Sequence, residues 1–183
     1  MNRRKALKLT AILFGGTVIG SDIFLSGCAK EVGSQGMFSE SDISFLDQVG
    51  ETILPETERS PGAKAAKIGL FMKTIVTDCY GEKEQEVFLS GMTSLDTMAR
   101  TKYSEDFLRL TNHQRHDLLV PLDQGSRDAK DGDPLQFFQM MKQLTIWGYF
   151  SSEQGVTKAL RYNPIPGEYK GCVPYTHEDK AWA

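Results

Sequence analysis

The chain has 183 residues, a quarter of them charged, and its 24 acidic side chains outnumber the 21 basic ones to give a net charge of −3. This balance argues against a nucleic acid as partner, because nucleic-acid-binding domains carry an excess of basic residues. The length is sufficient for one domain with a hydrophobic core of its own.

The first 27 residues have the features of an export signal. Arg3 and Arg4 precede an apolar run, Leu9 to Leu25, and small residues then lead to Cys28. Paired arginines ahead of such a run predict a Tat signal, which exports folded proteins, with a Sec signal as the alternative. The end of the run resembles a lipobox, in which Cys28 is lipidated after cleavage. A retained transmembrane helix is the other interpretation, but the run is short and is interrupted by three glycines and Asp22.

Cleavage before Cys28 would leave 156 residues, with 17 basic and 23 acidic side chains and a net charge of −6. That charge argues against a polybasic membrane patch, so the acyl chains of the lipoprotein would be the sole attachment to the membrane. We therefore expect a lipid-anchored protein on the periplasmic side of a bacterial membrane. Ala29 carries no acidic retention signal, which favours the outer membrane. Residues 28–37 are polar and contain glycine and serine, as expected of a flexible tether.

Residues 38–183 are interpreted as one domain that is helical as far as Tyr162. Apolar residues recur at helical spacing and no segment alternates strictly, so strands are not expected. Ser39 and Thr111 are predicted N-caps, and Pro55 is predicted to end the first helix. The predicted helices span residues 39–54, 63–80, 82–102, 111–122, 134–150 and 152–160, with a charged loop over residues 124–132. The predicted fold class is all-α, a compact bundle of about five to six helices.

The last segment, residues 163–183, has a different character. Two prolines and a glycine over residues 163–167 end any helix, and the rest of the segment shows no periodicity. It nevertheless contains Tyr169, Tyr175 and Trp182, whereas disordered segments are poor in aromatic residues. We therefore expect an extended tail that docks on a surface.

Two cysteines remain once Cys28 is lipidated, namely Cys79 and Cys172. An even pair in an oxidising compartment favours a disulfide, which would stabilise the fold by about 3–5 kcal/mol through loop closure. Two separate buried thiols are the alternative.

Few residues in the sequence carry recognisable chemistry. His113 and His116 are three apart, with Asp117 beside them, and this spacing is compatible with a metal site. The first turn of a polar helix is where solvated histidines also occur, and we favour that interpretation. Phosphate-binding glycine loops, CxxC pairs and nucleophile–base spacings are not found in the sequence. We therefore expect no catalytic, cofactor-binding or metal-binding residue in this chain.

Aromatic residues are concentrated late in the sequence. Trp147 and Tyr149 lie at the end of a predicted helix, and Tyr169, Tyr175 and Trp182 lie in the tail. Such residues either fill a core or anchor an interface, where aromatic side chains contribute strongly to affinity. The sequence leaves both interpretations open for these five.

Two groups of motifs resemble the small (gamma) subunit of gluconate 2-dehydrogenase, the subunit 3 family. The looser group is Ile53-Leu54-Pro55-Glu56-Thr57 with Pro61-Gly62-Ala63. The more specific group lies in the C-terminal third and comprises residues 145–153, 159–167, 169–175 and 180–183. The resemblance runs from about Phe38 to the end of the chain, and the twin-arginine leader is also similar to that of the family.

This resemblance implies an accessory subunit without catalytic residues of its own. The implied partner is an FAD-dependent oxidoreductase of the glucose–methanol–choline type that oxidises a sugar or sugar acid with an acceptor other than NAD or oxygen. A cytochrome c subunit with haem often completes such complexes. The chain would act as export escort, assembly factor and membrane anchor, with the five late aromatic residues as candidate anchors for the partner. A stand-alone periplasmic lipoprotein that binds a small ligand or a cell-wall component is the alternative.

Overall fold

Five α-helices and three short helical turns form the described part of this computed structural model, which covers residues 36–127, 135–165, 167–168 and 171–183. The predicted export arginines Arg3 and Arg4, the lipidation site Cys28 and the tail residue Tyr169 lie outside the described residues. Residues Phe38–Ala183 form one compact unit.

The elements follow one another in the predicted order, and the fold class is all-α as predicted; no strand occurs within the described ranges. The α-helices are α2 (Glu40–Ile53), α3 (Ile68–Cys79), α4 (Glu82–Tyr103), α5 (Asn112–Ser126) and α6 (Gln136–Ser151). The short turns are η1 (Ala63–Ala66), η2 (Phe107–Arg109) and the π-helical η3 (Gly155–Ala159).

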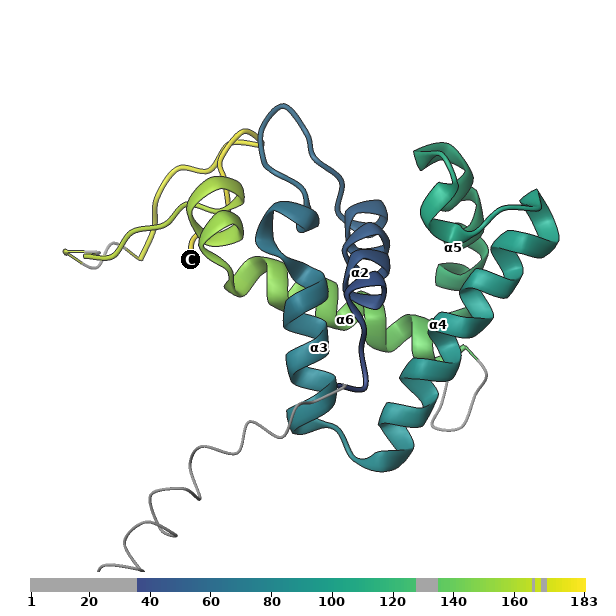
Figure 1. Ribbon diagram of the computed structural model, residues 1–183. Helices are drawn as coiled ribbons and strands as arrows, with labels where there is room; N and C mark the ends of the chain where they lie inside the picture. Colours follow the sequence, from purple (N-terminus) through teal and green to yellow (C-terminus); the bar gives the residue numbers. More distant parts are fainter. Residues whose placement is uncertain (1–35, 128–134, 166, 169–170) are drawn as a thin grey trace, which may run out of the picture. The chain divides into compact units, whose positions relative to one another are not determined.

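Helix α6 is the shared element of the bundle. It packs against α2, α3, α4 and α5, and it crosses behind α2 in Figure 1. Its buried face carries Phe137, Phe138, Met141 and Leu144. The residues that line the centre of the bundle from the other elements are fully buried: Leu46, Val49, Ile68, Met72, Val76, Phe88, Leu95 and Phe107. Of the helices that the structure describes, none is long and apolar enough to cross a membrane.

Both predicted helix starts are confirmed. The Ser39 hydroxyl accepts from the backbone N–H of Asp42, and the Asp42 carboxylate accepts from the backbone N–H of Ser39. Thr111 and Gln114 form the same reciprocal pair at the start of α5. Each pair provides partners for backbone donors that a helix leaves unpaired at its N-terminus.

The predicted continuous helix over residues 63–80 is wrong, because the chain breaks at Lys67. Lys67 has a left-handed backbone (φ 53°), and it separates η1 from α3. The Asp47 carboxylate on α2 accepts from the Gly69 N–H at 2.7 Å, so α2 caps the new helix. A Cβ on Gly69 would lie 2.2 Å from the Ile43 carbonyl oxygen, which shows how closely α3 begins against α2.

Helix α5 is longer than expected, since it continues to Ser126 through Pro121 and takes in the start of the predicted loop over residues 124–132. A proline cannot donate to the carbonyl four residues earlier, which here belongs to Asp117. Lys102 of α4 donates to that carbonyl at 3.4 Å instead.

The chain end is not packed along the bundle as a docked tail would be. We call the described residues 160–165, 167–168 and 171–183 the C-terminal arm, drawn at the left of Figure 1 in yellow-green and yellow. All residues from 171 to 183 are exposed. The arm closes on its own base, where the Arg161 N–H donates to the Ala181 carbonyl at 2.7 Å and the Ala183 N–H donates to the Arg161 carbonyl at 3.2 Å.

Candidate partner-binding surface

An apolar patch lies where α3 and α6 meet. The Trp147 side chain is 56% exposed, and its ring packs edge-on against Phe71 with centroids 5.3 Å apart. Ile146 and Phe150 are also exposed and lie four residues apart on α6, one turn of the helix. We call these four residues the α3–α6 patch.

Close packing of the two helices places Phe71 beneath Trp147. A Cβ on Gly148 would lie 2.4 Å from a Phe71 ring carbon and 2.5 Å from the Ile68 Cδ1. Glycine at this position therefore lets α3 approach α6, and the approach holds the Trp147 ring in place.

Tyr149 is not part of this surface, and its prediction as a partner anchor is corrected. Its side chain is 3% exposed, and its hydroxyl donates to the Pro61 carbonyl. Successive residues of a helix point about 100° apart. Trp147 and Tyr149, two residues apart, therefore point about 200° apart, which places Trp147 on the surface and Tyr149 in the core.

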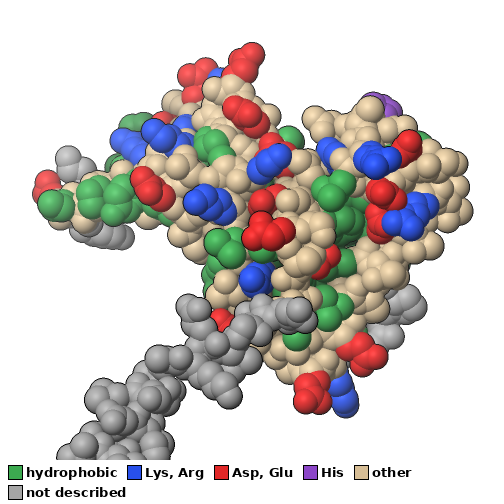
Figure 2. Space-filling view, in the orientation of Figure 1, with side chains coloured by type: hydrophobic (Ala, Val, Ile, Leu, Met, Phe, Trp, Pro, Cys, Tyr) green, Lys and Arg blue, Asp and Glu red, His purple; other side chains and the backbone are tan. Residues whose placement is uncertain are grey.

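The two predicted tail anchors that the structure describes, Tyr175 and Trp182, are exposed. The side chain of Tyr175 is 73% exposed and that of Trp182 is 56% exposed. The Arg161 guanidinium lies 4.0 Å from the Trp182 ring centroid, so one face of that ring is already in contact. Figure 2 shows hydrophobic side chains on the arm at the left, whereas charges of both signs are mixed over the rest of that face.

Cys79 and Cys172 are two free, exposed thiols in the structure, which does not contain the predicted disulfide. Cys79 is the last residue of α3, and because both thiols are exposed, the alternative of two buried thiols is wrong. Burial, together with neighbouring Cys79 and Glu84, raises the pKa of Tyr80 above its ordinary value. The pairing of the two cysteines stays a prediction.

The histidines of α5 lie on its surface. His113 Nδ1 is 3.0 Å from an Asp117 carboxylate oxygen, and both side chains are accessible to water. His116 is exposed beside α2. Within the described ranges, no three His, Cys, Asp or Glu side chains are grouped closely enough to hold a metal ion.

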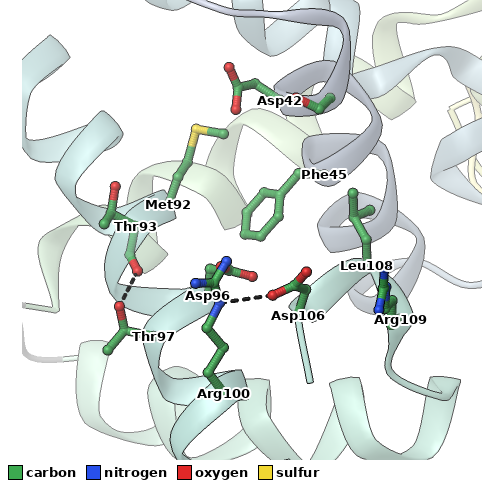
Figure 3. Close-up of a pocket in the computed structure, with 11 residues that line it drawn as sticks. Asp42, Phe45, Met92, Thr93, Asp96, Thr97, Arg100, Asp106, Leu108 and Arg109 are labelled. Atoms are coloured by element: carbon green, nitrogen blue, oxygen red, sulfur yellow. Dashed lines mark hydrogen bonds and ion pairs between the residues drawn. The ribbon is translucent and has the colours of Figure 1, made fainter. Parts of the chain in front are cut away.

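A pocket of about 560 Å³ lies between the start of α2, the middle of α4 and η2 (Figure 3). Phe45, Met92 and Leu108 give it an apolar lining. Arg100 pairs with the Asp96 carboxylate at 3.0 Å and with the Asp106 carboxylate at 2.8 Å.

Three of the charged residues that line this pocket, Asp96, Arg100 and Asp106, connect η2 and the residue before it to α4. The second oxygen of Asp96 accepts from the Phe107 N–H at 2.9 Å. The Thr93 and Thr97 hydroxyls donate to carbonyls of their own helix, and neither contacts a base. The arrangement is structural, because its polar groups bind one another.

A second groove, of about 470 Å³, separates the loop after α2 from the first turn of α5. The side chain of Arg115 lies at this groove and is 7% exposed. Sequence reasoning missed it, although Arg115 precedes Leu118, Leu119 and Leu122 by three, four and seven residues, the spacing of one helix face.

The family described as gluconate 2-dehydrogenase subunit 3 matches residues 40–167, which is more than two thirds of the chain. The chain belongs to this family. No curated protein and no solved structure shows a significant match to it.

The residues that match the family include some candidate surfaces of this subunit 3 protein and exclude others. It begins with α2 and extends through η3, so it contains the α3–α6 patch and the groove beside Arg115. Tyr175 and Trp182 lie beyond residue 167, outside the matched part. Family membership therefore bears on the patch and the groove more directly than on the outer arm.

Proposed function

We propose that the chain is the non-catalytic small subunit of a membrane-associated, FAD-dependent sugar or sugar-acid dehydrogenase. The partner is a flavin oxidoreductase of the glucose–methanol–choline type, and the chain escorts it through export, assembles with it and anchors it. A cytochrome c subunit with haem is a third member in some such complexes. Membership of the gluconate 2-dehydrogenase subunit 3 family supports this role.

The observation that carries the proposal is the α3–α6 patch. Exposed apolar groups on a soluble domain mark interaction sites when they are contiguous, and tryptophan is among the residues that contribute most to binding. Phe71 fixes the Trp147 ring before any partner arrives, with centroids 5.3 Å apart. A pre-organised anchor loses less conformational entropy on binding than a mobile one.

The proposed location of the protein rests on the predicted export signal, residues 1–27, and on Cys28. Arg3 and Arg4 are the export signal of the proposal, and Cys28 is its lipid anchor. A flavin enzyme must bind FAD in the cytoplasm, so a passenger without a signal needs a folded-protein export route. The complex then resides on the periplasmic side of a bacterial membrane, with the outer membrane favoured.

Co-expression with a flavin oxidoreductase encoded by the neighbouring gene tests the proposal. We expect a stable 1:1 complex by size-exclusion chromatography with light scattering. Trp147→Ala should weaken it by about 2 kcal/mol or more, roughly 30-fold, as for an interface anchor. The matched control is Leu108→Ala, an exposed leucine in η2, which should bind as the unmodified chain does.

Two results would contradict the proposal. Export and full activity of the flavin subunit without this chain would show that the flavin subunit needs no escort. An unchanged affinity of the Trp147→Ala variant for the flavin subunit would show that the α3–α6 patch is not part of the interface.

Truncation after Asn163 tests the contribution of the tail to the same complex. We expect loss of the complex, while circular dichroism still shows a folded helical bundle, because the arm residues removed are exposed. Retained binding would show that the tail is not needed for assembly.

A further inference from the structure

Arg115 is a buried cation whose hydrogen bonds, within the described part of the chain, all go to neutral acceptors, and its guanidinium lies 5.8 Å from the centroid of the Phe107 ring. Its Nε donates to the Phe107 carbonyl at 3.1 Å, and its Nη2 donates to the Leu108 carbonyl at 2.7 Å. Its Nη1 donates to the Gln48 Oε1 at 3.1 Å and to the Asn112 Oδ1 at 3.2 Å. Among the residues that the structure describes, no carboxylate lies within ion-pair distance of it.

This arrangement leaves a positive charge without a counter-charge in contact. Burial lowers the pKa of the Arg115 guanidinium below its ordinary value, because the charged form loses hydration. Carbonyl dipoles offset part of that loss, but a buried charge is normally paired with an opposite one. The local chemistry therefore favours the arrival of an anion.

The groove beside Arg115 also presents hydrogen-bond donors. A guanidinium only donates, so Gln48 and Asn112 must turn their amide oxygens toward it. Their NH₂ groups are then left as donors, and both residues line the groove. The Lys64 side chain lies at the same groove and adds a second positive charge.

Two carboxylates share this groove, and one of them is already engaged. The Glu51 oxygens accept from the Glu56 N–H at 2.9 Å and from the Lys64 N–H at 2.8 Å. Glu51 thus holds the groove wall in place rather than pairing with Arg115. The Glu56 side chain is exposed at the opening. The positive charges of Lys64 and Arg115 offset the negative charges of the two glutamates. The amide NH₂ donors of Gln48 and Asn112 lie on the side of the groove that α2 and α5 form.

We infer that the groove between α2, residues 56–65 (the loop after α2 and the start of η1) and the first turn of α5 is a carboxylate-binding site built on Arg115, Gln48 and Asn112. A carboxylate there would gain charge-assisted hydrogen bonds from the amide NH₂ groups and a counter-charge in Arg115. Its source is either an acidic side chain of the partner subunit, which rests on the proposed function, or a free organic acid.

The isosteric variant Gln48→Glu tests the site by supplying an internal carboxylate. It places a negative charge at the position from which Oε1 now contacts Arg115 at 3.1 Å. We expect the melting temperature to rise by about 2–4 °C. Asn112→Asp is a second variant of the same design. The control is Gln143→Glu on the exposed face of α6, which should leave the melting temperature unchanged.

Two binding measurements distinguish the sources. The first compares stabilisation of the isolated chain by sodium acetate with that by sodium chloride at equal ionic strength. The second measures the affinity of the chain for the flavin subunit. A stabilising acetate effect that Gln48→Glu abolishes supports a free carboxylate. A loss of partner affinity of about tenfold or more in Gln48→Glu, with no acetate effect, supports an acidic side chain of the partner.

The inference is overturned if neither measurement responds to Gln48→Glu, or if neither Gln48→Glu nor Asn112→Asp raises the melting temperature. Failure of the unmodified chain to bind the flavin subunit would instead count against the proposed function. The acetate measurement on the isolated chain would still report on the site.

Discussion

The bundle and the C-terminal arm hold their aromatic residues in opposite ways. In the bundle, Phe88 and Phe138 are buried among side chains from several helices. In the arm, Tyr175 and Trp182 are exposed, and one short set of contacts at Arg161 closes the chain end. The bundle therefore stabilises the fold, whereas the arm adds surface that a partner can reach.

The same contrast occurs within two residues of α6. Trp147 faces water and Tyr149 faces the core, where its hydroxyl contacts the Pro61 carbonyl. Proximity in sequence thus says little about role, because the phase of the helix decides which side chain is available to bind. Substitutions on the two sides should separate stability from binding.

The largest expected effect is on the core side. Phe88→Ala removes a fully buried ring that packs edge-on against Phe38 with centroids 6.2 Å apart. We expect a loss of about 3–5 kcal/mol in the free energy of unfolding, measured by urea denaturation with circular dichroism. Tyr175→Ala in the arm is the control and should stay within about 0.5 kcal/mol. Similar losses for both would mean that the arm is part of the folded core.

A smaller effect is expected for Tyr149→Phe. This change removes only the hydroxyl and leaves the Pro61 carbonyl without that donor. We expect a loss of about 1–2 kcal/mol in the free energy of unfolding. Trp147→Phe is the matched change on the exposed side and should cost less than about 0.5 kcal/mol. Equal effects would show that burial does not distinguish the two residues.

The helices and their starts could be predicted because local chemistry determines them. Ser39 and Thr111 cap their helices through residues three positions away, so a short stretch of sequence contains the whole motif. The apolar spacing likewise predicted a helix over residues 134–150, which the structure shows as α6. These features need no information from distant parts of the chain.

The errors arose where distant residues intervene. The break at Lys67 depends on Asp47 of α2, which caps Gly69 across 22 residues of sequence. The role of Arg115 depends on Gln48, which is 67 residues away. Spacing within one segment cannot reveal either partner.

A pH experiment compares one carboxylate from each region. In the bundle, the hydrogen bond from Lys142 is the main cause that lowers the pKa of Asp123, and it links α5 to α6. In the arm, hydrogen bonds from the backbone and hydroxyl of Thr176 lower the pKa of Asp179. A depressed carboxyl pKa stabilises the folded state above the unfolded-state value of about 3.9. That stability is lost as the pH falls through the lower, folded-state value.

Asp123→Asn should therefore reduce the stability of the bundle at neutral pH and flatten its decline below about pH 4. The expected loss is about 1 kcal/mol or less, since the pair is partly exposed to water. Asp179→Asn should leave the pH dependence of bundle unfolding unchanged, because its contacts lie within the arm. A larger effect of Asp179→Asn than of Asp123→Asn on the pH dependence of unfolding would show that the arm unfolds together with the bundle.

The smallest effect on stability, and the most local one, is expected at the base of the arm. Arg161 and Trp182 interact at 4.0 Å on the surface, where such a contact contributes about 0.5–1 kcal/mol. Arg161→Ala removes this contact but keeps the two backbone hydrogen bonds of residue 161, so it should free the Trp182 ring without lowering the unfolding midpoint of the bundle. The chain has two tryptophans, Trp147 and Trp182, so fluorine NMR of protein labelled with 5-fluorotryptophan gives one signal for each region. The Trp182 signal should move toward its solvent-exposed position, whereas the Trp147 signal, set by Phe71, should stay in place. Movement of both signals would show that arm and patch form one coupled surface, and the division between bundle and arm would then have to be redrawn to include the end of α6.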